Sequence, residues 1–131
     1  MWEAESRITD AELEIMRALW ASEEPMTLAQ LKSVLAERHG WSGDTTKTLL
    51  RRPCEKGAVG QEKRKVYCYR PLVARDQLGR YHTQKLIDKL YAGSAKAMVA
   101  ALVEQGQLQA QDVAELQGMF QDLWEKEDGS S

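Results

Sequence analysis

Apolar residues recur at helical spacing in three successive stretches of the N-terminal half of the chain. The first stretch begins at residues 9–12, a capping box in which a threonine hydroxyl and a glutamate carboxylate can each bind the backbone N–H of the other residue. The second begins with a similar box at residues 27–30 and reaches Gly40, a residue type that often ends helices. The third follows a short turn at residues 42–44 and covers residues 45–52. This spacing predicts three helices.

The pattern then changes from helical to alternating. Residues 56–60 are typical of a turn that leads into a short strand, and residues 62–65 form a charged tip. Residues 66–70 alternate aromatic and other side chains before Pro71, which favours a second strand. Three helices followed by a two-stranded hairpin form a winged helix-turn-helix. We therefore expect a mainly α fold class with a small antiparallel β-hairpin wing, followed by a helical dimerisation tail.

The remainder of the chain has only helical patterns. One helix is predicted over residues 75–91 and ends before Gly93. Ser94 can cap a second helix, and a third covers residues 111–124. Fewer than 60 residues in three amphipathic helices bury too little surface to be stable alone. Their apolar faces therefore need a partner, for which a second copy of the tail is the economical choice. Packing against the winged helix is the alternative.

These patterns predict two domains, a winged helix over residues 1–73 and a helical dimerisation domain over residues 74–131. Trp20 and Trp41 are expected to pack between helices, and Trp2 is expected to be disordered or to cover the first helix. Residues 128–131 are expected to be frayed. The predicted dimer contacts are apolar residues of the tail: Leu86, Leu90, Met98, Val99, Leu102, Val113, Leu116, Phe120, Leu123 and Trp124.

Charge is distributed unevenly along a chain whose net charge is only −2. Between residues 38 and 70, nine basic residues face three acidic ones, which leaves a local charge of +6. Concentrated positive charge, hydroxyls and arginines suit phosphate oxygens and guanine acceptors, so we predict double-stranded DNA as a partner. The predicted contacts are Ser42, Thr45, Lys47, Thr48, Arg51 and Arg52 on the third helix and Lys63, Arg64 and Lys65 at the hairpin tip. The alternative is a dimeric winged helix that binds proteins, with these side chains merely solvated.

Other classes of function find little support in the sequence. No apolar run approaches the ~18 residues that cross a bilayer, and the N-terminus lacks the features of a secretory signal, so we expect a cytoplasmic protein. His39 and His82 are isolated, and no phosphate-binding glycine motif occurs, so we expect no enzyme, metal or cofactor. Cys54 and Cys68 either sense an oxidant or a metal, or are two small buried side chains.

Several motifs spread over nearly the whole chain resemble the BlaI/MecI/CopY repressors, the penicillinase repressor family of winged-helix proteins. The first motif is residues 8–16 with Leu19 and Trp20, and the second is Trp41, Thr45, residues 47–50, Arg52 and residues 56–57. The others are residues 69–73, 93–94, 98–99 and 112–116. The resemblance implies a homodimer on an operator with two-fold symmetry. It also implies repression of resistance or metal-homeostasis genes and an induction step.

The sequence departs from these relatives at three places. Members that respond to β-lactams are cleaved at an Asn-Phe bond, but Ala101 and Leu102 occupy the matching positions. Members that respond to copper carry paired cysteines in the tail, where this chain has none after Cys68. The inducing signal therefore stays open: an unidentified ligand, another protease, or no signal at all. Pro53 replaces an apolar residue of the third helix, which we expect to kink or end near Arg52.

Overall fold

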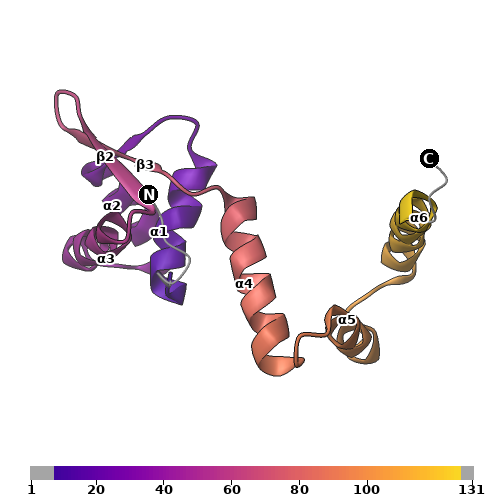
Figure 1. The fold of residues 1–131 in the computed structure, drawn as a ribbon. Coiled ribbons are helices and arrows are strands. Elements are labelled where there is room, and N and C mark those ends of the chain that lie inside the picture. The colour runs from indigo at the N-terminus through magenta and orange to yellow at the C-terminus, as the bar shows by residue number, and fades with distance from the viewer. Residues whose placement is uncertain (1–7, 128–131) are drawn as a thin grey trace. The chain divides into compact units, whose positions relative to one another are not determined.

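The structure is a computed structural model that describes residues 8–127 (Figure 1). It confirms the mainly helical fold class with a small antiparallel sheet. The predictions for Trp2 and residues 128–131 lie outside the described residues. The elements in chain order are α1 (Asp10–Ala21), β1 (Met26–Thr27), α2 (Leu28–His39), α3 (Gly43–Glu55), β2 (Val59–Lys63), β3 (Tyr67–Pro71), α4 (Arg75–Leu90), α5 (Ala95–Glu104) and α6 (Ala110–Glu127).

The predicted caps of the first two helices are confirmed. At α1, the Glu12 N–H donates to Thr9 Oγ1 at 3.1 Å, and the Thr9 N–H donates back to Glu12 Oε1 at 3.2 Å. At α2, Thr27 and Gln30 exchange the same two hydrogen bonds at 2.9 and 3.1 Å. Gly40 ends α2 with a φ of 68°, a left-handed conformation that glycine adopts without steric cost.

The sheet has three strands in the order β1-β3-β2, all antiparallel, where the sequence predicted only the β2–β3 hairpin. The hairpin runs in register from the pair Val59–Pro71 to the pair Lys63–Tyr67. The additional strand, β1, is formed by two residues, and its Met26 pairs with Tyr69. A strand of two residues shows no alternation in the sequence. It exists because it pairs with a distant strand, so the local pattern could not reveal it.

The first three helices enclose the core beneath the sheet, and the β2–β3 hairpin projects beyond them (Figure 1). Both expected tryptophans, Trp20 and Trp41, are partly buried against this core. Its fully buried side chains include Ile15, Met16, Leu19, Leu31 and Leu35. The core is completed by Leu50 of α3, Val59 of β2, Val73 of the connection between β3 and α4, and Leu78 of α4.

Helix α3 does not end near Arg52, so the prediction of an end there was wrong, whereas the alternative, a kink near Arg52, stays a prediction. The helix continues through Pro53 to Glu55. Proline has no backbone N–H, so a single carbonyl near the end of the helix loses its hydrogen-bond donor. The following turn is well bonded, because the Lys56 N–H donates to the Arg52 carbonyl at 3.0 Å and the Ala58 N–H donates to the Pro53 carbonyl at 2.9 Å. The Pro53 ring is fully buried, and its packing offsets the lost bond.

The chain divides into two compact units, residues 1–82 and 83–131, and the division falls within α4. The predicted division into a winged-helix domain that ends at residue 73 and a dimerisation domain that begins at residue 74 remains a proposal. In the second unit, Ser94 caps α5 as predicted, because its hydroxyl accepts the Ala97 N–H at 3.0 Å. Among the described helices, none is both long enough and apolar enough to cross a membrane.

Candidate nucleic-acid interface

The outward face of α3 carries hydroxyl and basic side chains. Ser42 is the N-cap, its Oγ accepts the Thr45 N–H at 3.1 Å, and its hydroxyl lies 3.0 Å from Thr45 Oγ1. On the inward face, Thr46 and Leu50 are buried, which fixes the rotation of the helix about its axis. The six residues predicted for this helix are all exposed: Ser42, Thr45, Lys47, Thr48, Arg51 and Arg52.

The tip of the hairpin adds a second exposed basic group. Lys63, Arg64 and Lys65 are all exposed, as predicted. The Lys63 ammonium lies 4.9 Å from the centre of the Tyr67 ring, which orients it by a cation–π contact. Arg64 contacts Glu62 at 3.3 Å, an exposed ion pair that contributes little to stability. Both predicted basic groups are therefore available to solvent, and their contact with one nucleic acid remains a proposal.

A buried ion pair that sequence reasoning missed holds the C-terminal end of α3. Glu12 was expected only to cap α1, but its fully buried carboxylate also accepts a hydrogen bond from Lys56 Nζ at 2.6 Å. This contact joins the first turn of α1 to the residue that follows α3, immediately after the proline. Since the partners are 44 positions apart, no local signal could have identified the pair.

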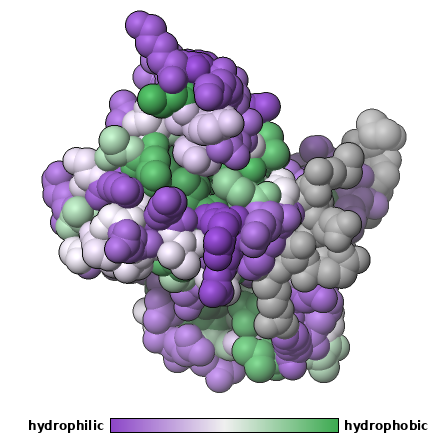
Figure 2. Space-filling view, turned by 90° about the vertical axis from the view of Figure 1, so that its left-hand side faces the viewer, coloured by the Kyte–Doolittle hydropathy of each residue, from purple (hydrophilic) through white to green (hydrophobic). Residues whose placement is uncertain are grey.

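A cavity of about 330 Å³ lies between α3, the start of α2 and the sheet. Figure 2 shows apolar surface below the hydrophilic wing on this side of the molecule. Leu28, Leu50 and half-buried Cys54 contribute the apolar part of the lining. Burial raises the pKa of the Cys54 thiol, and the negative charge of Glu55 raises it further. Cys68 is buried in β3, and both cysteines are free thiols.

His39 and His82 lie outside this surface. His39 Nε2 is 2.9 Å from Glu14 Oε1, and its ring packs against Trp41 with centroids 5.3 Å apart. His82 packs edge-on against the ring of Tyr81. Within residues 8–127, no group of three or more metal-ligating side chains is arranged to hold an ion.

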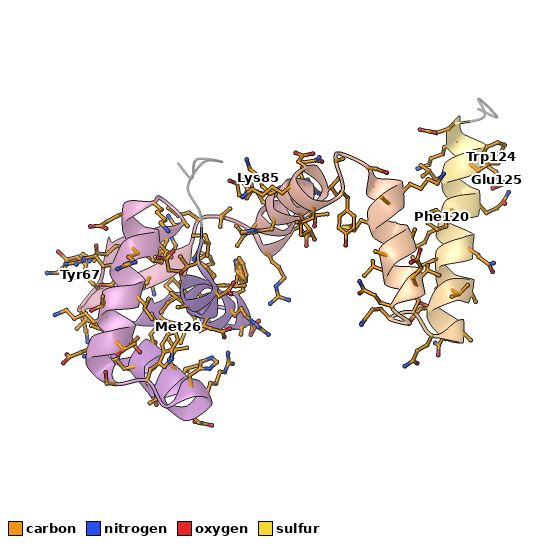
Figure 3. The ribbon with its side chains drawn as sticks, turned by 90° about the horizontal axis from the view of Figure 1, so that it is seen from below. Met26, Tyr67, Lys85, Phe120, Trp124 and Glu125 are labelled. Carbon is orange, nitrogen blue, oxygen red and sulfur yellow. The ribbon has the colours of Figure 1, made fainter. Side chains whose placement is uncertain are left out.

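The residues predicted to make the dimer leave apolar surface open in the single chain. Phe120 and Trp124, one turn apart on α6 (Figure 3), are 55% and 67% exposed. Leu90 at the end of α4 is 70% exposed. The other predicted contacts are also exposed or only partly buried: Leu86, Met98, Val99, Leu102, Val113, Leu116 and Leu123.

Comparison with known proteins identifies the family. Residues 8–122, nearly the whole chain, match the family model of the penicillinase repressor. The chain belongs to the penicillinase repressor family. The resemblance noted in its sequence motifs is thereby confirmed.

Two members of this family are similar in sequence to most of this chain. The penicillinase repressor of Bacillus licheniformis is 30% identical over 111 residues, which are 84% of this chain and 86% of the relative. The methicillin resistance regulatory protein MecI of Mammaliicoccus sciuri is 29% identical over 115 residues, which are 86% of this chain and 92% of the relative.

Two solved structures match the winged-helix part of the chain. The DNA-binding domain of the repressor BlaI is 29% identical with a TM-score of 0.52, and the match covers 59% of this chain and 93% of the domain. The monomeric form of Bacillus licheniformis BlaI in complex with the blaP half-operator is also 29% identical, has a TM-score of 0.50 and covers the same shares. These matches confirm the predicted winged-helix fold class.

Proposed function

We propose that this member of the penicillinase repressor family is a sequence-specific DNA-binding repressor that acts in the cytoplasm as a homodimer. Its operator has two-fold symmetry, and it controls genes of the resistance or metal-homeostasis type. The observation that carries this proposal is the exposed face of α3. That face presents hydroxyls and three cations on a helix whose opposite face is fixed in the core.

The solved relative bound to a half-operator supports DNA as the partner of this fold. A recognition helix enters the major groove with its first turns nearest the base edges. In α3 those turns carry the hydroxyl pair Ser42 and Thr45, followed by Lys47 and Thr48. The hairpin tip then contacts neighbouring phosphates through Lys63, Arg64 and Lys65, which adds affinity with little sequence information.

The exposed apolar side chains of the tail support the homodimer. Large exposed apolar groups are costly in water, and a second copy covers them through a two-fold interface in which the same surface contributes twice. A dimer also matches a palindromic operator, because each winged helix then reads one half-site. We propose that induction acts through a ligand or a protease that breaks one of these two interfaces.

The salt dependence of DNA binding tests this proposal. Lys47, Arg51, Arg52, Lys63, Arg64 and Lys65 are the six cations of the two basic groups. If each neutralises one phosphate, the logarithm of the association constant of one protomer falls with a slope of about −5 against the logarithm of salt concentration. Exchanging Lys63, Arg64 and Lys65 together for glutamine should flatten the slope by about 3 per protomer.

A matched triple variant controls for net charge. Arg80, Lys89 and Lys96 are exposed cations of α4 and α5, outside both basic groups. Their exchange for glutamine should leave the slope within about one unit of the original value. Equal flattening by both triple variants would show that total charge governs binding. The assignment of the wing to the DNA interface would then fail.

A further inference from the structure

The cavity between α3 and the sheet has the size and lining of a small-molecule site. Its volume of about 330 Å³ lies at the lower end of the range for ligand pockets, roughly 300–1,000 Å³. Leu28, Leu50 and Cys54 form an apolar floor, and Gln61 and Tyr69 contribute polar groups from the two hairpin strands. Apolar walls with a few polar groups are typical of sites that bind organic molecules.

Two cations in the lining make this cavity favour a negatively charged ligand. Lys47 and Arg51 are successive residues of one helical face, and both line the cavity. Among the described residues, neither forms a salt bridge. An arginine presents a planar fork of donors that matches two oxygens of one oxyanion. No acidic side chain lines the cavity, so the charged groups in its lining are both positive.

We propose that this cavity binds a small amphipathic oxyanion, an organic carboxylate with an apolar ring or chain, and that its binding excludes DNA. The ring or chain occupies the apolar floor, and the carboxylate contacts Arg51 and Lys47. The raised pKa of Cys54 keeps its thiol neutral at physiological pH, so the floor carries no negative charge against the ligand.

Exclusion of DNA follows from shared residues. Lys47, Thr48 and Arg51 line the cavity, and the same three residues belong to the face of α3 proposed to contact the operator. A ligand that occupies both cations removes them from the DNA phosphates, so the two partners compete directly. This regulatory consequence rests on the proposed function, whereas binding of the carboxylate itself does not.

The first experiment measures binding of 2-naphthoate to the full chain in the absence of DNA, by isothermal titration calorimetry. The neutral analogue 2-naphthamide and inorganic phosphate are measured in parallel. We expect naphthoate to bind with one site per chain, roughly tenfold tighter than naphthamide because of the charge-assisted contacts. Phosphate should bind more weakly than naphthoate, because it gains nothing from the apolar floor. Equal affinity for acid and amide, tighter binding of phosphate, or no binding of naphthoate would overturn the proposal.

Four variants locate the site. Arg51→Gln should reduce naphthoate affinity roughly tenfold and leave naphthamide unaffected, whereas the exposed cation control Arg80→Gln should change neither. Cys54→Met fills the floor and should weaken both aromatic probes, whereas Cys54→Ala leaves the cavity open and should weaken them much less. Thermal unfolding confirms that each variant is folded. Unchanged binding in folded Arg51→Gln or Cys54→Met would place naphthoate elsewhere and contradict the proposal.

A competition measurement separates the ligand site from the repressor function. Naphthoate should raise the apparent Kd of the original chain for the DNA upstream of its own gene, but not that of Cys54→Met. Operator binding without any naphthoate binding would overturn the ligand site and leave the repressor proposal intact. Naphthoate binding without any DNA binding would overturn the repressor proposal and leave the ligand site intact. Simultaneous binding of naphthoate and operator would refute the exclusion mechanism.

Discussion

Removing the amine of Lys56 should destabilise the winged helix more than any single change on its surface. Glu12 is 0% exposed, and Lys56 Nζ lies 2.6 Å from its Oε1 atom. Its second oxygen, Oε2, is buried with no hydrogen-bond partner among the described residues. The variant Lys56→Met therefore strands a carboxylate in the core.

The cost of this variant follows from the geometry of the pair. Breaking a buried ion pair by removing one partner costs about 3–5 kcal/mol. The Lys56 side chain is 27% exposed, so solvent screens part of the attraction and we expect about 3 kcal/mol. Glu12→Gln should cost less, because the lysine left behind can turn toward water. The double variant should be more stable than Lys56→Met alone, because a neutral amide replaces the stranded charge.

Urea unfolding at pH 7, followed by tryptophan fluorescence, measures all four proteins of this double-mutant cycle. The exposed control Lys89→Met should change the free energy of unfolding by no more than about 0.5 kcal/mol. If Lys56→Met cost less than about 1 kcal/mol, or if the two single changes were additive, the pair would not be coupled. The reasoning from burial would then be refuted.

Three further predictions concern a glycine, a tryptophan and a thiol. Gly40→Ala should lower the free energy of unfolding by about 1 kcal/mol, because φ at residue 40 is 68°. Gly79→Ala lies inside a helix with open space around it and should raise the free energy of unfolding by about 0.5–1 kcal/mol. Thermal unfolding measures both, and equal effects would contradict this prediction. Trp20→Phe should cost about 1–2 kcal/mol, because the indole N–H donates to the Val73 carbonyl at 3.0 Å, and unchanged stability would show that this bond contributes nothing. Burial raises the pKa of the Cys54 thiol above 9.0 in the folded state. The stability linked to this shift is fully present below the pKa of the unfolded chain and is lost as pH rises through the pKa of the folded state. Alkylation of Cys54 at pH 8 should therefore be slower in the folded than in the urea-unfolded chain, and equal rates would contradict the shift.

Local rules predicted much of the fold because the relevant signals lie within a few residues. The capping boxes at Thr9 and Thr27, the glycine stop at Gly40 and the cap at Ser94 each depend on partners three or four positions away. The exposed face of α3 was predictable for the same reason, since the buried positions of a helix determine which positions remain outside.

The features that were missed depend on tertiary contacts. Strand β1 exists because Met26 and Thr27 pair with β3, and the Glu12–Lys56 pair joins residues 44 positions apart. The continuation of α3 past Pro53 depends on burial of the proline ring, which the sequence does not display. The cavity likewise arises from four elements, α2, α3, β2 and β3, which meet only in the folded chain.

The most direct test of the central claim is an anisotropy titration of the full chain against the palindrome-containing DNA upstream of its own gene, with scrambled DNA of equal length as the control. We expect tight, salt-sensitive binding to the native DNA alone, and loss of that binding in Arg52→Ala. Equal binding to both DNAs would contradict sequence-specific recognition by α3. Absence of binding to either DNA at low salt would contradict the DNA-binding role itself.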